Sequence, residues 1–485
     1  WAEPDTLRGD ARIPARGAGT PGMVAGLLEA HRRFGRLSRA QVMAPAIALA
    51  RDGFVVTPLL SRTIRSARER LARDSAALQL FMPDGEALRP GERLVQPALA
   101  STLERIARDG RDGFYTGPVA EALSAEVRAL GGLITVRDLA TYPVATMRPL
   151  CAEWNGYTVL GAPPPVSGSA VIEILQMAEA AGITKADGFT DGPEAIVTLA
   201  GIQRAVTSDG GWWRGDPAVM AVPARGLSSE GYARERLEAV RSLMQAPDTV
   251  LRGDPWSHEM DAPEAACTRD PYPSATRRGR SGAAPSEANA GQSAATSGDG
   301  APDAPDAPSY TSHLSVVDAE GNAVSLTTTV GVLFGSGVYT GGFFLNSSGN
   351  NFDDRTQGVN RYANSTIAPM ILLEGDDVRL VIGAAGSAYI QPSTAQVTMR
   401  ILAFGEDAGL AIAAPRIQTS AVRREVEVEP GFTSDVYAAL VRAGYLPTSR
   451  VSDLAFGAVH GVHVRRDGRR IGIADPRRDG AAVAQ

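Results

Sequence analysis

Thr311 lies at the border between two very different segments, and its residue type could carry out chemistry. It follows a polar stretch and begins a β-rich one. A threonine hydroxyl is a weak nucleophile that needs an adjacent base. A cut between Tyr310 and Thr311 would create an α-amine with an ordinary pKa of about 7.7–8.0, which could serve as that base. Taken alone, these residues favour the simpler interpretation, a threonine that merely begins a strand.

Other catalytic chemistries lack the residues that they need. The five histidines form no His-Glu-x-x-His pattern. His460 and His463 are three positions apart on an expected strand, so their side chains should point to opposite faces, which argues against a zinc pair. The sequence has no Gly-x-Ser-x-Gly or Walker A pattern, and residues 335–337 lack the third glycine of a dinucleotide-binding motif. We therefore expect neither a metal nor a cofactor.

The composition is that of an ordinary globular protein. The chain has 485 residues, 44% of them hydrophobic, and a net charge of -6, so it offers nothing that attracts nucleic acid. No apolar run is long enough to span a membrane. The chain begins with Trp1 and shows no signal peptide, so we expect its start to be cut. For Cys151 and Cys267 one disulfide is conceivable, but two free thiols are expected.

The elements that must position Thr311 are expected to be a helical first part followed by mixed helices and strands. Residues 1–145 read as mostly helical, with a capping box at Ser38 and Gln41 and a cap at Thr57. Strands at 313–317 and 323–329, joined by a turn, predict a hairpin that begins at the threonine. We expect further helices at 171–181, 193–206, 392–404 and 434–443, and strands at 157–160, 370–373, 378–382, 425–428 and 460–465.

Residues 262–309 form a stretch with no Val, Leu, Ile, Met, Phe or Trp. Such a segment cannot bury enough apolar surface to offset the entropy of ordering it, so we expect disorder. A structureless segment of this length within an enzyme needs an explanation. It is either a linker between domains or a segment that is released when the chain is cut.

A longer pattern begins at the same threonine. The run TSHLSVVDAEGNAVSLTTT (residues 311–329), followed by FGSG at 334–337, resembles the start of the small subunit of gamma-glutamyltransferases, or glutathione hydrolases. In that family the first threonine is the nucleophile. Further segments resemble other parts of the same family, at residues 17–22, 50–54, 114–117, 131–135, 163–168 and 474–482.

The resemblance implies an α+β fold, the four-layer αββα sandwich of N-terminal-nucleophile hydrolases. It implies a large subunit of residues 1–310 and a small subunit of residues 311–485, cut from one precursor. Thr311 would attack a γ-glutamyl amide such as glutathione. Water, an amino acid or a peptide would then release the acyl group from the enzyme. Periplasmic or secreted localisation also follows from the resemblance, with no nucleic acid partner and no membrane span in this chain.

The resemblance also assigns roles to individual residues. Thr329 matches the threonine that activates the nucleophile. Gly386 and Ser387 match the paired glycines whose N–H groups stabilise the oxyanion, an effect of about 3 kcal/mol per donor. The simpler interpretation of Ser387 is a helix N-cap before Pro392. Ser365 and Thr366 match the pair that contacts the substrate α-carboxylate.

Three departures from the family pattern concern substrate recognition. Gly331 stands where the family has Asn or Glu, and Ser348 and Asn351 replace polar and acidic partners of the substrate amino group. An ammonium group prefers a carboxylate to a neutral amide. The family's initial segment, roughly 100 residues with a carboxylate-binding arginine, is also expected to be missing. Two alternatives therefore stay open, a related acylase for glutaryl or cephalosporin-type amides and an unprocessed, non-catalytic homologue.

Overall fold

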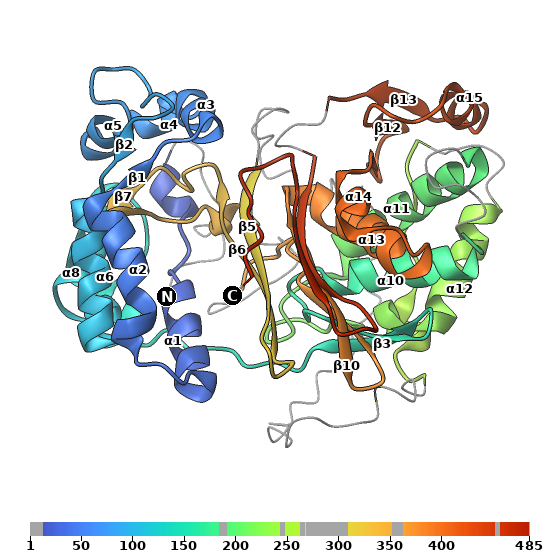
Figure 1. Cartoon of the computed structure of the whole chain (residues 1–485), viewed down its shortest axis with the longest axis horizontal. Coiled ribbons are helices and arrows are strands. Elements are labelled where there is room, and N and C mark those ends of the chain that lie inside the picture. The colour runs from blue at the N-terminus through green and yellow to red at the C-terminus, as the bar shows by residue number, and fades with distance from the viewer. Residues whose placement is uncertain are drawn as a thin grey trace, which may run out of the picture.

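The computed structural model describes residues 13–183, 192–242, 248–261, 267, 309–351, 362–451 and 456–484. The predicted disorder of residues 262–309 concerns residues outside these ranges, apart from Cys267 and the backbone of Ser309. Asp353 and Asp354, which could replace the missing acidic partner of the substrate amino group only if a loop shifts, also lie outside the described residues. Within the described part, helices lie on both sides of two layers of β-structure (Figure 1).

The first part of the chain is helical, as predicted. Its helices are α1 (Met23–Phe34), α2 (Arg39–Asp52), α3 (Pro58–Ser66), α4 (Arg68–Leu71), α5 (Ser75–Phe81), α6 (Pro97–Asp109), α7 (Asp112–Tyr115), α8 (Gly117–Ala129) and α9 (Val136–Ala140), with a short pair of strands, β1 (Phe54–Val55) and β2 (Arg93–Leu94). The capping box of Ser38 and Gln41 and the cap at Thr57 are both present. Local capping chemistry therefore sets these helix starts.

Six strands form the central antiparallel sheet, in the order β15-β14-β10-β9-β4-β3. They are β3 (Leu150–Trp154), β4 (Tyr157–Gly161), β9 (Met370–Glu374), β10 (Asp377–Ala385), β14 (Ala458–Val464) and β15 (Arg470–Ala474). β10 is buried from Leu380 onward because it is covered on both faces. The predicted strands at 157–160, 370–373, 378–382 and 460–465 are confirmed within a few residues.

The predicted hairpin forms a second β-layer. β5 (Ser309–Val317) pairs with β6 (Ala323–Val332), and both strands pack against β10. Asp318 accepts hydrogen bonds from the backbone N–H groups of Glu320 and Asn322, which closes the turn. A short pair, β7 (Tyr339–Thr340) and β8 (Phe343–Phe344), follows it. The closed turn sets the register of the hairpin.

Helices cover the other face of the central sheet. They are α10 (Gly168–Ala180), α11 (Pro193–Trp213), α12 (Glu230–Arg241), α13 (Ile390–Thr398) with a π-helical turn at Met399–Ala403, α14 (Ala408–Ala413) and α15 (Ser434–Arg442). A small sheet of β11 (Ile417–Thr419), β12 (Glu425–Val428) and β13 (Leu446–Ser449) lies beside them. α11 extends seven positions beyond the predicted end at 206. The largest apolar core lies between these helices and the sheet.

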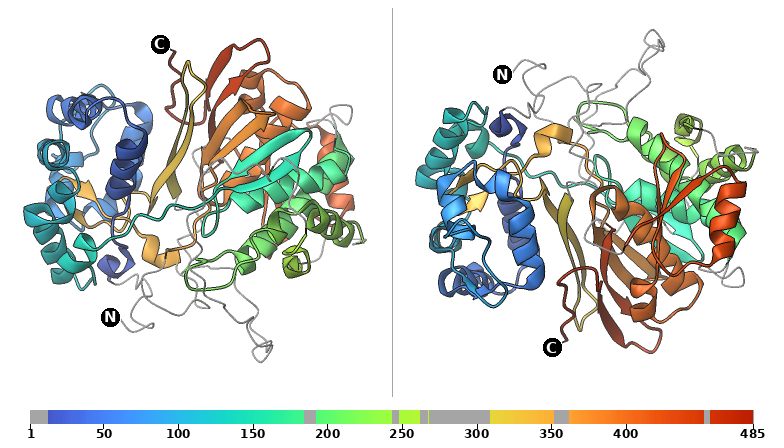
Figure 2. Two further views of the ribbon diagram at one scale, coloured as in Figure 1. Left: turned by 90° about the horizontal axis from the view of Figure 1, so that it is seen from below. Right: turned by 90° about the horizontal axis from the view of Figure 1, so that it is seen from above.

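The order of layers is helices, hairpin, central sheet, helices. Figure 2 shows the hairpin between the N-terminal helices and the sheet in both of its views. This arrangement confirms the predicted α+β class with four αββα layers. No helix among the described residues is both long and apolar enough to cross a membrane.

The prediction of two free thiols is wrong. Cys151 on β3 and Cys267 form a disulfide, with a Cα–Cα distance of 5.6 Å across 116 positions of sequence. Sequence spacing carried no information about this pairing, because the fold alone brings the two residues together. His460 and His463 lie on β14, as expected, and no group of three metal-ligating side chains occurs in the described ranges.

Candidate active site

The hairpin register brings two threonine hydroxyl groups together. Thr311 on β5 stands directly opposite Thr329 on β6. The Thr311 hydroxyl donates to Thr329 Oγ1 at 3.3 Å, and Thr311 is only 6% exposed. A nucleophile and its activating neighbour require such a pairing. The hydrogen bond that the Thr311 hydroxyl donates fixes the direction of the lone pairs on the attacking oxygen.

A β-bulge lies next to Thr311. Ser309 pairs with Val332 and Thr311 with Thr329, so two residues of β6 face Tyr310 alone. One of them, Gly331, donates its N–H to Thr329 Oγ1 at 2.9 Å. The bulge therefore holds the activating hydroxyl on its second side.

Gly331 has a local reason to be glycine. Its φ is +87°, a conformation that side chains rarely adopt. An added Cβ would also lie 2.2 Å from Ser347 Oγ. Ser347, which is buried, accepts a hydrogen bond from the Val332 N–H at 3.2 Å. The space that a larger side chain would need at position 331 is thus filled by Ser347.

Arg478 contacts the candidate nucleophile, and the sequence analysis did not identify this arginine as a site residue. Its Nη1 donates to the main-chain carbonyl of Thr311 at 2.9 Å. The two residues are 167 positions apart, so only the tail motif at 474–482 offered a signal. The arginine fixes the backbone of Thr311 and places a positive charge beside it.

A neutral histidine lies beside the threonine pair, on the same face of the hairpin and opposite Thr327. The His313 ring contacts Thr327 Oγ1 at 2.8 Å and Ser315 Oγ at 2.9 Å. Burial, with His460 nearby, lowers the pKa of His313 to about 3. A Cβ on Gly383 would lie 2.4 Å from His313 Cε1, so the ring rests on bare backbone of β10. The uncharged ring allows the two β-layers to pack closely here.

β10 ends in the predicted oxyanion loop. Gly386 and Ser387 both have positive φ, +134° and +54°. Positive φ is uncommon for a serine and typical of strained functional backbone. The loop continues into a short 3-10 turn, Ser387–Tyr389, which β5 contacts. The backbone N–H groups of this loop therefore lie near the strand that carries Thr311.

The N-cap interpretation of Ser387 is wrong. α13 begins at Ile390 with Tyr389 as its N-cap, and no side chain caps it. The 3-10 turn separates Ser387 from the helix by two residues. Its position is therefore explained by the backbone conformation of the loop.

The predicted substrate-binding residues lie on two adjoining loops. Ser348 and Asn351 bound a 3-10 turn, and the Asn351 carbonyl accepts from the Asn364 N–H at 3.2 Å. Ser365 and Thr366 follow directly and are half-buried. The structure therefore brings Asn351 to the Ser365 loop, while Ser348 lies one turn away. Through Ser347, the Ser348 turn also adjoins Gly331.

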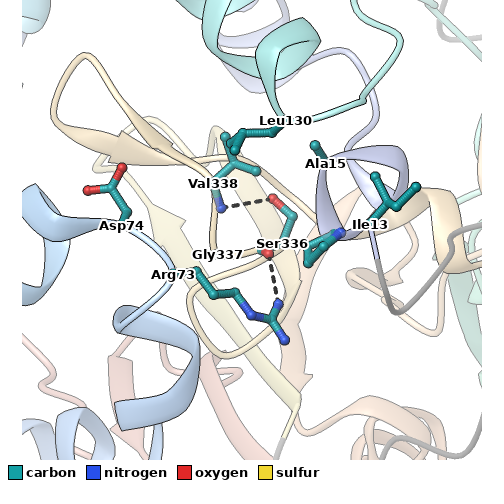
Figure 3. A pocket seen from close by; sticks show the side chains of 9 residues that line it. Ile13, Ala15, Arg73, Asp74, Leu130, Ser336, Gly337 and Val338 are labelled. Atoms are coloured by element: carbon teal, nitrogen blue, oxygen red, sulfur yellow. Dashed lines mark hydrogen bonds between the residues drawn. The ribbon is translucent and has the colours of Figure 1, made fainter.

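A cavity of about 390 Å³ lies apart from these residues (Figure 3). In it the Arg73 guanidinium donates to the Ser336 carbonyl at 3.3 Å, and the Val338 N–H donates to Ser336 Oγ at 3.3 Å. None of the candidate nucleophile, oxyanion or substrate residues lines it. The cavity lies between the helical first part and the loop after β6, and we assign no chemistry to it.

A paired threonine on the inner hairpin of an αββα sandwich, beside a strained backbone loop, defines an N-terminal-nucleophile hydrolase. The family model of gamma-glutamyltranspeptidase matches residues 3–485, nearly the whole chain. The chain therefore belongs to the gamma-glutamyltranspeptidase family. By this membership it is an enzyme of the gamma-glutamyltransferase and glutathione hydrolase class.

Individual relatives agree with this assignment. The chain is 30% identical to a glutathione hydrolase proenzyme of Bacillus subtilis, over 96% of this chain and 74% of the relative. It is 31% identical to the acylase ACY 1 proenzyme of a Pseudomonas strain, over 97% and 76%. The crystal structure of cephalosporin acylase from Bacillus halodurans aligns with a TM-score of 0.78 at 25% identity, covering 97% of this chain and 79% of that one.

Proposed function

We propose that this enzyme cuts its own chain between Tyr310 and Thr311 and then hydrolyses or transfers γ-glutamyl amides such as glutathione. The pieces would be residues 1–310 and 311–485. The observation that carries the proposal is the hydrogen bond from the Thr311 hydroxyl to Thr329 Oγ1. The relatives named as proenzymes support a precursor that is cut.

In this mechanism each half-reaction moves one acyl group. The Thr311 oxygen attacks the γ-amide carbonyl while its proton passes to the free α-amine of the same residue. N–H groups of Gly386 and Ser387 stabilise the negative oxygen that forms. The C–N bond of the substrate amide then breaks, and the leaving amine takes the proton from the α-amine of Thr311. The glutamyl group remains as an ester on Thr311. Water or an acceptor amine then attacks this ester and regenerates the hydroxyl.

A related acylase activity is the second candidate. Gly331 leaves no side chain to hold a substrate ammonium, because Ser347 occupies that space. Asn351 is neutral, which removes the carboxylate that would pair with an ammonium. Both observations favour an acyl group without an amino substituent, such as glutaryl. The Pseudomonas acylase relatives support this alternative.

An oxidising location is also proposed, namely the periplasm or the exterior of the cell. The Cys151–Cys267 disulfide supports it, because disulfides persist mainly in such compartments.

Replacing the nucleophile tests the main proposal. We expect the wild-type protein to give two bands on a denaturing gel, the smaller one with the N-terminal sequence Thr-Ser-His. T311A should remain one uncut chain and lose turnover by at least about a thousandfold, since no other group can form the ester. T328A, on the partner strand β6 with its hydroxyl directed at Met23 of α1, is the matched control and should be cut and active.

The donor preference separates the two candidate activities. Turnover of a γ-glutamyl anilide above that of a glutaryl anilide supports the first, and the reverse order supports the acylase. An uncut and inactive wild-type protein would instead indicate the non-catalytic homologue. Cleavage that persists in T311A would contradict the assignment of the nucleophile.

A further inference from the structure

The turn that follows β10 holds its backbone in a conformation that needs support from outside. Gly386 and Ser387 have φ values of +134° and +54°, and a positive φ is unfavourable for a residue other than glycine. Such a conformation persists only where the surrounding structure over-determines it. The Tyr389 N–H donates to the Gly386 carbonyl at 3.0 Å. That bond closes the turn, but it does not hold the turn against the rest of the molecule.

The Tyr389 side chain ties this turn to the small sheet. Tyr389 is the last residue of the 3-10 turn and the N-cap of α13, so its ring begins two positions from Ser387. Its hydroxyl donates to the Glu427 carboxylate on β12. Arg450, directly after β13, donates to the other oxygen of that carboxylate at 2.9 Å. Both oxygens of Glu427 are therefore engaged, which fixes the acceptor that the tyrosine uses.

Packing holds the Tyr389 ring as well. The Arg450 guanidinium carbon lies 5.8 Å from the ring centroid, and the centroid of the fully buried Phe456 ring lies 5.1 Å from it. A Cβ on Gly457 would lie 2.7 Å from the Tyr389 carbonyl oxygen, so the chain after Phe456 lies directly against the turn. The ring cannot turn away from Glu427 unless these neighbours move.

β11 supports the same turn at a second point. Gln418 is buried, and its Nε2 donates to the Ala388 carbonyl at 3.3 Å. Gln418 on β11 stands directly opposite Glu427 on β12, so both side chains lie on one face of the small sheet. The small sheet belongs to neither main β-layer. Through these two side chains it contacts the turn that carries the proposed oxyanion N–H groups.

We propose that Tyr389, braced by Glu427 and Arg450, is a positioning residue for the oxyanion site. The inference rests on the proposed function, in which N–H groups of Gly386 and Ser387 stabilise the negative oxygen. An N–H donor acts only within a narrow range of distance and direction. The brace keeps the turn in one conformation, so the N–H groups are aimed before the substrate arrives. Because the negative oxygen forms only during the reaction, the brace should affect kcat and leave substrate binding unchanged.

The competing explanation is that the bond from Tyr389 to Glu427 only stabilises the fold. In that case Y389F would lower the thermal unfolding midpoint, while the folded enzyme would keep its kcat. Hydrogen exchange of a peptide that covers residues 383–391 reports on the turn itself and needs no turnover. We expect faster exchange of this peptide in Y389F. Y437F, which removes a hydroxyl group from a tyrosine of α15 beside the main core, is the matched control and should exchange like the wild type.

Kinetics with a γ-glutamyl anilide and a glutaryl anilide test the catalytic role. For Y389F we expect kcat to fall about tenfold to a hundredfold with KM nearly unchanged, because a hydrogen bond to a charged group is lost. E427Q keeps an oxygen that accepts from the tyrosine but loses the ion pair with Arg450, so its kcat should fall less. E427A should lose as much as Y389F. The double variant Y389F/E427A should lose no more than either alone, because both changes remove the same brace.

The two readouts separate this inference from the proposed function. Unchanged exchange in Y389F overturns the brace, whatever the activity. Faster exchange with an unchanged kcat, or equal losses of kcat in Y389F and Y437F, overturns the positioning role even where Thr311 is confirmed as the nucleophile. A wild-type protein that turns over neither anilide would refute the proposed function and the positioning role with it, while faster exchange in Y389F alone would still establish the brace.

Discussion

The proposed chemistry of Thr311 depends on three neighbours that each fix a different atom. Thr329 Oγ1 accepts a hydrogen bond from the Thr311 hydroxyl, the Gly331 N–H orients Thr329, and Arg478 holds the Thr311 carbonyl. Two of these contacts come from the hairpin register, and the third comes from the far end of the chain. Together they leave the hydroxyl one favoured orientation before any substrate arrives.

Arg478 should also tune the base. Once the chain is cut, its charge lies beside the α-amine of Thr311, and a nearby cation disfavours the protonated amine. The amine pKa is thereby lowered, and more of the amine is free to act as a base. In R478Q the amine pKa should rise, so the acidic limb of the kcat/KM profile should move to higher pH. The profile is measured with a γ-glutamyl anilide.

Two further variants separate the effect of the Arg478 charge on that pH profile from other effects of the substitution. R478K retains the charge and should keep the acidic limb near its wild-type position. R470Q removes an exposed arginine from β15 and is the matched control. An acidic limb that stays in place in R478Q would contradict an electrostatic role and leave only the contact with the carbonyl.

At the scale of elements, three helices meet around a buried carboxyl group. Glu173 on α10 is 1% exposed, and burial together with Asp209 on α11 raises its pKa well above the ordinary value. Asp209 itself accepts from Tyr232 and Arg236 of α12, at 2.8 and 2.7 Å. Glu173 therefore keeps its proton in this cluster.

This cluster makes stability depend on pH. The folded chain binds the Glu173 proton more tightly than the unfolded chain, so this stabilisation is complete below the unfolded pKa and is lost as pH rises through the folded one. E173Q imitates the protonated acid. It should match wild type near pH 4.5 and exceed it at higher pH, by up to about 1.4 kcal/mol per pH unit between the two pKa values.

Thermal unfolding midpoints at several pH values measure this difference. E238Q changes an exposed carboxylate on α12 and should show no such growing difference from wild type. A gap between E173Q and wild type that does not widen with pH would mean that Glu173 is ionised in the fold.

The elements also show what the sequence could and could not predict. The helix starts at Arg39, Pro58 and Val136 follow from capping residues within three positions, so they can be predicted from the local sequence. The hairpin and its threonine pair follow from a short turn and a family pattern. Arg478 was missed, because its contact with Thr311 spans 167 positions and depends on how the layers pack. The Cys151–Cys267 disulfide was not predicted for the same reason.

At the scale of the whole molecule, the proposed cut divides a single core. β4, in the first piece, pairs with β9, in the second, from Thr158 opposite Leu373 to Gly161 opposite Met370. The main apolar core likewise draws on both pieces, for example Ile172 and Ile382. Separating the pieces would expose this core and an unpaired strand edge. The disulfide, in contrast, joins two residues of the first piece only.

We therefore expect the cut protein to remain one particle in which packing alone holds the pieces together. On size-exclusion chromatography both pieces should elute together, with or without a reductant, because no covalent bond crosses between them. On a denaturing gel they should separate even without a reductant, and a reductant should alter the mobility of the larger piece alone, since its Cys151–Cys267 loop then opens. The T311A chain is the uncut reference in both experiments. Elution of the smaller piece by itself under native conditions would refute a core shared between the two pieces.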